Sequence, residues 1–410
     1  MSALASLTKP TLFAASVSLA ITGSALFSGN ADAAKKKTGL DVQIHYLRMM
    51  PKVRPVLSNL EPAPKNSGLA GAELGIKDSN TTGRFTGQHY MLNSQYFESE
   101  EAFMAEADRL MQKNALVLID APSGLLAQTD KLAAERGALI FNTGNSDDQL
   151  RTSLCLNNTF HTYPSRAMHT DALAQWLATR RFSRWMLIEG PAEEDKAYAS
   201  ALKRSAKRFG SEIVLKKEWT FDSDLRRTAQ KELPLFTQGD EYDVVLVADE
   251  AGDFGHYVPY NTWLPRPVAG TQGLTPKAWH KVVEQWGAAQ LQSRFEKLHD
   301  RHMNDKDYAA WAAIRSISEA ILQNKEQKGI QHHAEPMKHF LLSEKFHLAA
   351  FKGHKLTYRQ WNGQLRQPMP LVQPRSLVSQ SPQAGYLHPK TELDTLGFDQ
   401  QESQCRINQS

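Results

Sequence analysis

The sequence has 410 residues, and its 48 Lys and Arg against 44 Asp and Glu give a formal net charge of +4. Such a small surplus, scattered along the chain, gives no reason to expect a nucleic acid as partner. Hydrophobic residues make up 41% of the chain, which is ample for packing. Because the length exceeds what one ordinary hydrophobic core holds, the sequence predicts two lobes.

The first residues have the pattern of an export signal. Lys9 gives a positive start, residues 11–27 are mostly small and apolar, and residues 31–33 offer the small-x-small pattern that signal peptidase reads. A membrane anchor is the alternative, but the stretch is short and interrupted by polar residues, so it would span roughly 30 Å of hydrocarbon poorly. We expect a signal peptide over residues 1–33, cleavage after Ala33, and a mature periplasmic protein that is not inserted in the membrane.

The chain has two cysteines, Cys155 and Cys405. In a protein exported to an oxidising compartment, this count suggests a single disulfide between them. One buried and one exposed thiol is the alternative, and the sequence leaves it open.

Short apolar runs alternate with amphipathic helical stretches from about residue 40 to residue 273. Runs of this length are typical of buried strands. The expected strands are residues 115–119, 138–141, 185–188, 212–215, 243–248 and 267–270. Helical stretches separate them, which favours right-handed crossovers and parallel sheets. The sequence therefore predicts an α/β protein with two Rossmann-like lobes.

The strand and helix pattern breaks near residues 160–166, where Pro164 forces the preceding residue to be extended, as a crossing between lobes requires. Trp and Ile recur at helical spacing over residues 277–325, which predicts helix throughout. After about residue 367 the composition shifts to Pro, Gln and Ser, which predicts an extended tail and no third domain. The expected division is 1–33 signal peptide, 34–162 and 277–340 first lobe, 163–276 second lobe, 341–372 second-lobe and hinge return, and 373–410 tail.

Motifs for catalysis or cofactor binding are absent from the sequence. It contains neither a G-x-G-x-x-G nor a G-x-x-x-x-G-K-[ST] pattern. The run around Ser123 lacks the first glycine of a nucleophile elbow, since Ala121 stands there. His299 and His302, and the adjacent pair His332 and His333, come without cysteines or further ligands. We expect no enzyme, no cofactor and no metal site.

Polar residues follow four of the expected strands. They are Ser123, residues 143–145, residues 189–198 and residues 271–273. In open α/β sheets, ligands bind beyond the carboxyl ends of the strands, where hydroxyls and the amide groups of helix starts converge. Two facing sheets with such loops would form a cleft that closes on a solute. Helix capping is the alternative function for any one of these residues.

Several of these segments resemble the branched-chain amino acid-type (leucine/isoleucine/valine) periplasmic binding proteins. The resemblance covers about residues 40–340 and implies the type I periplasmic binding protein fold, with two lobes joined by a multi-strand hinge. The matching segments are residues 68–83 for the first helix, 139–145 for the second ligand loop, 159–165 for the crossover, 195–198 for a Tyr-bearing loop and 269–273 for the Gly-x-Glu-Gly loop.

A narrower resemblance is to substrate-binding proteins associated with pyrroloquinoline quinone-dependent alcohol dehydrogenase systems. It rests on residues 247–255, 361–366, 394–397 and Cys405. It implies a link to alcohol catabolism.

The family resemblance also implies a set of ligand-binding residues: Ser123, Thr143 and Asn145 in the first lobe, and Tyr198 and Gln272 in the second. In family members that bind amino acids, an acid stands at the position of Gln272. Since a buried ammonium needs a paired charge, the neutral Gln272 disfavours a standard amino acid and favours a neutral or acidic solute.

The sequence thus predicts a monomeric periplasmic receptor that binds a small polar solute and delivers it to the permease of an ABC importer. The alternative is a periplasmic ligand sensor, or an accessory protein of an alcohol oxidation system, that does not deliver to a permease. A neighbouring permease and ATPase pair in the genome would favour the importer.

Overall fold

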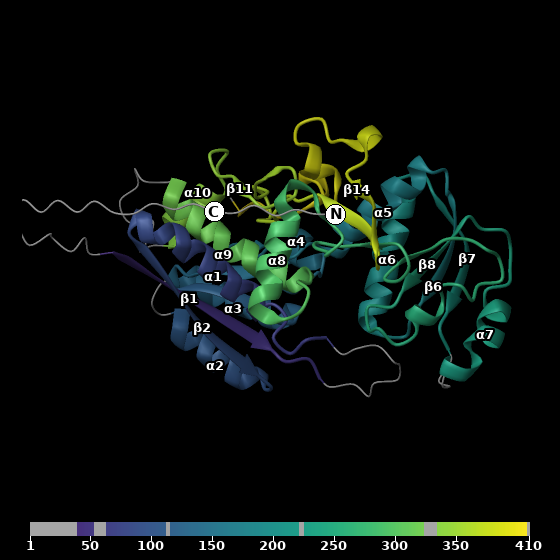
Figure 1. Ribbon diagram of the computed structural model, residues 1–410, viewed down its shortest axis with the longest axis horizontal. Coiled ribbons are helices and arrows are strands. Elements are labelled where there is room, and N and C mark those ends of the chain that lie inside the picture. The colour runs from purple at the N-terminus through teal and green to yellow at the C-terminus, as the bar shows by residue number, and fades with distance from the viewer. Residues whose placement is uncertain (1–38, 53–62, 112–114, 221–224, 324–333, 408–410) are drawn as a thin grey trace, which may run out of the picture. The chain divides into compact units, whose positions relative to one another are not determined.

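The computed structural model describes residues 39–52, 63–111, 115–220, 225–323 and 334–407 (Figure 1). The expected signal peptide, its cleavage site after Ala33, and His332 and His333 lie outside these residues. None of the described helices is long and apolar enough to cross a membrane.

The first lobe is built on a parallel five-stranded sheet in the order β2-β1-β3-β4-β5. Its strands are β1 (Leu40–Met49), β2 (Gln88–Phe97), β3 (Leu116–Asp120), β4 (Leu139–Asn142) and β5 (Thr159–His161). The helices between them are α1 (Leu69–Thr86), α2 (Glu100–Met111), α3 (Ser123–Arg136) and α4 (Gln149–Thr152). All of β3 is buried, with Leu118 packed in one core cluster and Val117 in another, so the sheet is covered on both faces.

The second lobe has a parallel four-stranded sheet in the order β7-β6-β8-β9. Its strands are β6 (Arg184–Glu189), β7 (Glu212–Glu218), β8 (Val244–Ala248) and β9 (Val268–Gly270). Helices α5 (Arg166–Thr179), α6 (Glu193–Arg208) and α7 (Leu225–Phe236) belong to it. The strand runs expected from the sequence over residues 115–119, 138–141, 185–188 and 243–248 are confirmed to within two residues.

After the second sheet the chain returns to the first lobe with α8 (Ala288–His299), α9 (Asp305–Gln323) and α10 (Ala334–Leu341). A Cβ on Gly71 would lie 1.8 Å from the Asp307 carbonyl oxygen, so this glycine allows α1 and α9 to pack closely. The expectation that residues 277–325 are helical throughout is wrong, because residues 277–284 and 300–304 lie outside helices. Trp286 and Asp300 have positive φ values of 55° and 51°, which interrupt the helical path on either side of α8.

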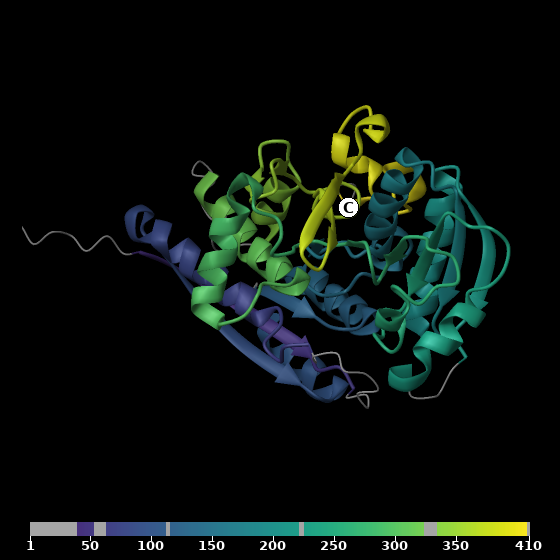
Figure 2. The ribbon, with the colours of Figure 1, turned by 45° about the vertical axis from the view of Figure 1, so that its right-hand side comes forward.

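A smaller, antiparallel sheet contains β10 (Thr275–Pro276), β13 (Met369–Gln373) and β14 (Ser376–Ser381). Separately, β11 (Leu348–Ala349) pairs with β12 (Lys355–Leu356). Figure 2 shows the β13–β14 hairpin, drawn in yellow, beside α5. Composition predicts an extended tail from residue 373, whereas the structure has β14 and three short 3-10 turns there. The reason is that Leu393, Leu396 and Ile407 find places in the cores of the lobes.

Three chain segments pass between the lobes side by side. The first runs from β5 to α5, the second follows β10, and the third includes residues 364–369. Gln364 Nε2 donates to the carbonyl oxygens of His161 and Tyr163, and Gln367 Nε2 donates to that of Thr162. This arrangement is a hinge of several strands. The lobe boundaries drawn from the sequence stay a prediction.

The C-terminal residues contact both lobes. The Gly397 amide donates to Asp171 Oδ2 in α5 over 2.8 Å, and Arg204 in α6 pairs with Glu402 over 3.2 Å. The structure joins Cys405 by a disulfide to Cys155, which follows α4 in the first lobe. The tail therefore connects the second lobe to the first across about ten residues.

Candidate functional site

Loops at the carboxyl ends of strands in both sheets line a set of adjoining cavities. Parallel strands end at the same edge of a sheet, so the loops that follow them gather there. The lining includes residues of segments 120–123 and 144–149 of the first lobe and of 193–198, 249–252 and 270–272 of the second. Both lobes therefore contribute to one space.

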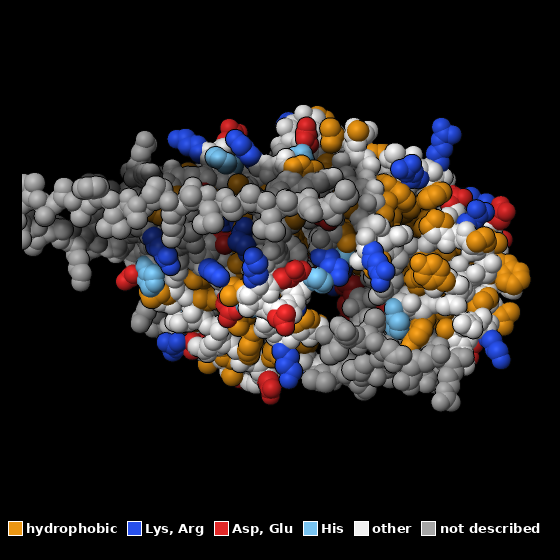
Figure 3. All heavy atoms as spheres, in the orientation of Figure 1, with side chains coloured by type: hydrophobic (Ala, Val, Ile, Leu, Met, Phe, Trp, Pro, Cys, Tyr) orange, Lys and Arg blue, Asp and Glu red, His pale blue; other side chains and the backbone are white. Residues whose placement is uncertain are grey.

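This space includes three cavities that adjoin one another among the described residues. We call the cavity between the lobes the central cavity; its volume is about 610 Å³. The first-lobe cavity, of about 720 Å³, includes Ser123 and Asn145, and the outer cavity, of about 830 Å³, includes His256 and His280. The central cavity shares lining residues with both. Figure 3 shows a hollow on this face with basic, acidic and histidine side chains at its rim. The volumes suit a small molecule.

The first-lobe residues implied by the family resemblance differ in where they point. Ser123 and Asn145 line the first-lobe cavity and are linked by a bond of 3.2 Å from Asn145 Nδ2 to Ser123 Oγ. The Ser123 hydroxyl itself donates to Asp147 Oδ2 over 2.7 Å. Thr143 is 1% exposed and its hydroxyl donates to the Ile119 carbonyl oxygen, so it lines none of the three cavities.

The second-lobe residues Tyr198 and Gln272 both line the central cavity. Tyr198 lies in the second turn of α6 and is 5% exposed, and burial raises the pKa of its hydroxyl well above the ordinary value. Within the described residues, neither the Tyr198 hydroxyl nor the Gln272 amide has a hydrogen-bond partner. The structure thus brings these two together, with Ser123 and Asn145 in an adjoining cavity.

A cluster of charged residues on the first-lobe wall was not expected from the sequence. Asp120, at the end of β3, pairs with Arg48 Nε at 3.2 Å and with Lys306 Nζ at 2.9 Å. A Cβ on Gly144 would lie 2.0 Å from Asp120 Oδ1, so only glycine allows the β4 loop to pass the carboxylate. The sequence hides the cluster because Arg48, Asp120 and Lys306 come from three distant elements.

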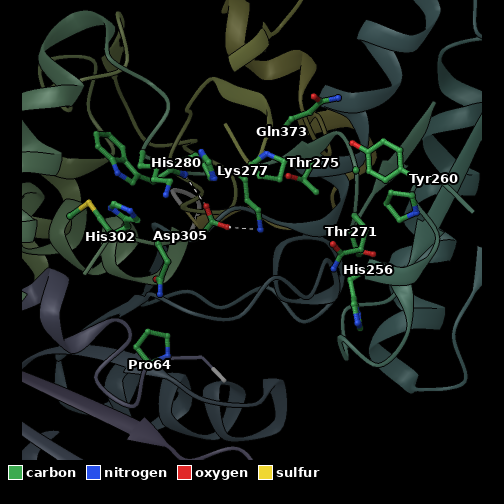
Figure 4. A pocket seen from close by; sticks show the side chains of 18 residues that line it. Pro64, His256, Tyr260, Thr271, Thr275, Lys277, His280, His302, Asp305 and Gln373 are labelled. Carbon is green, nitrogen blue, oxygen red and sulfur yellow. Dashed lines mark hydrogen bonds and ion pairs between the residues drawn. The ribbon is translucent and has the colours of Figure 1, made fainter. Parts of the chain in front are cut away.

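A second ion pair lies beside it. Lys277 follows β10, and its ammonium is 3.5 Å from Asp305 Oδ2 at the start of α9. Asp305 also accepts the Trp279 amide over 2.8 Å, which fixes the carboxylate. Figure 4 shows Lys277 directed toward Asp305, with Thr271 and His256 across the opening. Of this pair the lysine is the more exposed partner, at 38% against 14%.

The second-lobe wall has one ion pair of its own. Arg166, at the start of α5, lies 2.7 Å from Glu250 Oε2 in the loop after β8. Burial raises the pKa of Glu250 even though Arg166 opposes the shift. Its neighbour Asp249 accepts the backbone amides of residues 253, 254 and 255 and is 2% exposed, so it serves to shape the loop.

His169 completes the wall one turn into α5. Ser165 caps this helix, since its hydroxyl accepts the Met168 amide over 3.2 Å. The His169 Nδ1 lies 3.1 Å from the Ser165 carbonyl oxygen, so Nδ1 carries the hydrogen and Nε2 can only accept. Burial lowers the pKa of His169 to about 4, which keeps the ring neutral. The sequence singled out this crossover as a hinge and missed its histidine.

The arrangement offers binding groups and no assembled catalytic set. Ser123 donates to a carboxylate and has no histidine beside it. In the described part of the chain, no group of three or more His, Cys, Asp or Glu residues is placed to hold a metal ion. The largely buried His299 lies 3.7 Å from Glu73, whereas His302 pairs with Glu296 and lines the outer cavity.

The comparisons with known proteins agree with this geometry. A family model described as periplasmic binding protein matches residues 62–231. No curated protein sequence matches the chain. Among solved structures, a periplasmic binding protein from Burkholderia mallei has a TM-score of 0.64 at 13% identity, covering 90% of this chain and 99% of that one.

Two further solved structures are similar. A branched-chain amino acid ABC transporter periplasmic ligand-binding protein from Burkholderia xenovorans LB400 has a TM-score of 0.65 at 16% identity, over 89% of this chain and 99% of that one. An ABC transporter solute-binding protein from R. palustris in complex with benzoate has a TM-score of 0.56 at 14% identity, over 82% and 94%. At such identities the likeness carries the fold alone. The chain therefore has the type I periplasmic binding protein fold, with two parallel sheets.

Proposed function

We propose that the protein belongs to the branched-chain amino acid-type periplasmic binding proteins and is the solute receptor of an ABC importer. The single observation that carries this proposal is the central cavity, which residues from both lobes line at the carboxyl ends of their strands. The similar solved structures include ABC transporter binding proteins for amino acids and one holding benzoate, so the fold accepts small polar solutes.

Binding works by closure of the lobes. In this proposal a solute first meets one wall, and rotation about the hinge brings the other wall onto it. The three crossing segments, tied by Gln364 and Gln367, allow the lobes to rotate as bodies while each sheet keeps its packing. Closure expels water from the central cavity and joins two half-sites into one.

Export fits the same role. We propose cleavage of the signal peptide after Ala33 and release of a monomer into the periplasm, where the Cys155–Cys405 disulfide persists. The partners are a small solute and the permease of the importer. The bound solute stays chemically unchanged, and no enzymatic activity is proposed.

The resemblance to the pyrroloquinoline quinone-associated subgroup gives the proposal a setting in alcohol catabolism. Two of the segments that carry it contact each other, since Arg366 pairs with Asp394 at 2.8 Å. A sensor that changes shape on binding, without delivering to a permease, would use the same hinge. The two roles differ only in the partner that recognises the closed form.

Small-angle X-ray scattering tests the receptor proposal. The exported protein is measured before and after dialysis against extract of its own cells, and any small molecule retained is identified by native mass spectrometry. We expect a retained solute and a smaller radius of gyration when it is present. A radius that stays constant with no solute retained would contradict the proposal.

A reconstitution separates the importer role from the sensor role. The permease and ATPase encoded nearest the gene are placed in vesicles, and ATP hydrolysis is measured with closed and with open protein. Stimulation by the closed protein supports delivery to a permease. Closure without stimulation favours the sensor.

A further inference from the structure

We propose that the solute is an uncharged molecule that carries at least one hydroxyl group, of the diol or polyol class. This inference rests on the proposed receptor function and names the chemistry of its site. It follows from a contrast among the groups that line the central cavity: the charged groups already have partners, whereas several neutral groups have none among the described residues.

The charged groups are satisfied within the chain. Lys306 pairs with Asp120 at 2.9 Å, and Lys277 pairs with Asp305 at 3.5 Å. On the second lobe Arg166 and Glu250 pair at 2.7 Å. Asp249 accepts three backbone amides, and Glu194 also has an interaction within the chain. A charged solute would therefore have to compete with a pair that already exists.

Several neutral groups are left for a solute; the Ser146 and Tyr163 hydroxyls line the same cavity, and three further groups carry the assignment. The Tyr198 hydroxyl and the Gln272 amide line the cavity without a hydrogen-bond partner among the described residues, and so does the His169 Nε2. Tyr198 and His169 are each more than nine-tenths buried, at 5% and 8% exposure. Their unpaired polar atoms are not among the fully buried ones, so they are open to the cavity and water can reach them. If closure expelled that water without replacing it, these atoms would lose their hydrogen bonds, so a solute that bonds to them is favoured.

The chemistry of His169 sets the hydroxyl requirement. Its Nδ1 hydrogen is directed to the Ser165 carbonyl oxygen, so Nε2 needs a donor from the solute. A carboxylate has no hydrogen to donate, and an ammonium would bring an unpaired charge beside a neutral ring. A hydroxyl donates to Nε2 and can accept from Tyr198 or Gln272. A neutral hydroxylated solute is the class that satisfies all three groups.

Matched sets of probes test this assignment by calorimetry. Each set shares a carbon skeleton and differs in charge: propane-1,2-diol, lactate and alanine; glycerol, glycerate and serine; and 1-phenylethane-1,2-diol, mandelate and phenylglycine. We expect the neutral member of the best-fitting set to bind at least about tenfold more tightly than its two charged counterparts, since a charged solute leaves its own charge unpaired. Tighter binding of the acid or of the amino acid overturns the assignment.

Variants locate the binding. Tyr198→Phe, Gln272→Leu and His169→Phe should each weaken binding of the neutral probe by about three- to tenfold, the loss of one hydrogen bond. Tyr386→Phe and His388→Phe, whose side chains lie outside the three cavities, are the matched controls. Gln272 is half-buried, so its variant should fold even if a change at His169 does not. If the three variants bound the neutral probe as tightly as the controls do, Tyr198, Gln272 and His169 would not form the binding site.

The outcomes distinguish this inference from the function beneath it. If the protein closes on a solute from cell extract and that solute is charged, the receptor role stands and the assignment is wrong. The assignment is also wrong if the extract closes the protein but no neutral probe binds at millimolar concentration. If nothing closes the protein, the receptor role fails first.

Discussion

The two walls of the central cavity satisfy their polar groups in different ways. The first-lobe wall is held by ion pairs within the chain, in which Asp120 joins Arg48 and Lys306 and Asp305 joins Lys277. The second-lobe wall holds the Arg166–Glu250 ion pair, but it also presents the Tyr198 hydroxyl and the Gln272 amide, which have no hydrogen-bond partner among the described residues. In the proposed receptor these two groups receive their partners from the solute, whereas the ion pairs of the first wall exist without one.

Because of this difference, mutations in the two walls should affect different quantities, stability for the first wall and affinity for the second. A change in the first wall breaks contacts that exist in the empty protein, so it should reduce stability more than affinity. A change in the second wall removes contacts that form only on binding, so it should reduce affinity more than stability. The predictions below test that separation, in order of expected size.

The disulfide gives the largest expected effect on stability. It closes a sequence separation of 250 residues, which in the chain-entropy treatment is worth about 5 kcal/mol, with strain commonly lowering the value. Cys405→Ser should lower the midpoint of thermal unfolding strongly, because the tail loses its attachment to the first lobe. Alkylation of the exported wild type under denaturing, non-reducing conditions should find no free thiol, and two free thiols would contradict the pairing.

Asp120→Ala tests the first wall. Arg48 is 5% exposed, so losing its carboxylate leaves a buried charge without its partner, at a cost of about 3 kcal/mol. Urea unfolding should show this loss while the affinity of the remaining folded protein changes little. Asp108→Ala is the control, since the Asp108–Arg136 pair is more exposed, at 46% and 29%, and should contribute under about 1 kcal/mol. If Asp120→Ala lost affinity without losing stability, the first wall would act in binding, which is the opposite of the expected result.

Much of the fold could be predicted from the sequence because its central strands are buried on both faces. β3 and β8 are continuous apolar runs, which a periodicity argument detects directly. β2 was missed because it is an edge strand with mostly exposed polar side chains, so it has no apolar run. The helix expected over residues 277–325 failed at Trp286 and Asp300, whose backbone conformations no apolar pattern reveals.

The site was predicted less completely. Tyr198 and Gln272, which the family resemblance implied, line the central cavity, and their binding of a solute stays a prediction. Thr143 also follows a strand, but its hydroxyl points inward and donates to the Ile119 carbonyl oxygen. Its position in the sequence does not reveal whether the side chain points into the core or toward the cavity. Lys306 pairs with Asp120, and Lys277 with Asp305, only through tertiary packing, so the spacing of residues along the sequence does not reveal these ion pairs.

Gln272→Glu tests the second wall by adding a charge. The wild type should bind leucine, isoleucine and valine weakly, because an amide offers no full charge to an ammonium. A charge-assisted hydrogen bond contributes about 1.5–3 kcal/mol, so the variant should gain roughly 10- to 100-fold in affinity for these amino acids. Calorimetry with both proteins measures the change. Sub-micromolar binding of a branched-chain amino acid by the wild type would show that another acid, such as Glu250, holds the ammonium.

The smallest expected effect is the pH dependence of binding. It distinguishes the neutral His169 of the second wall from a histidine that becomes protonated near pH 6.5. Burial lowers the pKa of His169 to about 4; Asp305 nearby opposes the shift, whereas Lys277 and Lys352 add to it. The neutral ring is therefore the acceptor throughout the range from pH 5 to 8, and affinity for a neutral solute should stay constant there. Below about pH 4 protonation removes the acceptor and affinity should fall.

The free energy of unfolding should change with pH in the same direction as the affinity, falling at low pH. A folded pKa below the ordinary value of 6.5 means that the contribution of His169 is present above pH 6.5 and is lost as the pH falls from 6.5 through about 4. Calorimetry at pH 5, 6.5 and 8, with His388→Gln as the control for a more exposed histidine, measures the binding part. The contrary outcome is a severalfold loss of affinity between pH 8 and pH 5 that His169→Gln abolishes. It would mean that the His169 ring titrates near 6.5. The second wall would then gain a positive charge as the pH falls, and it would no longer differ from the first wall by being neutral.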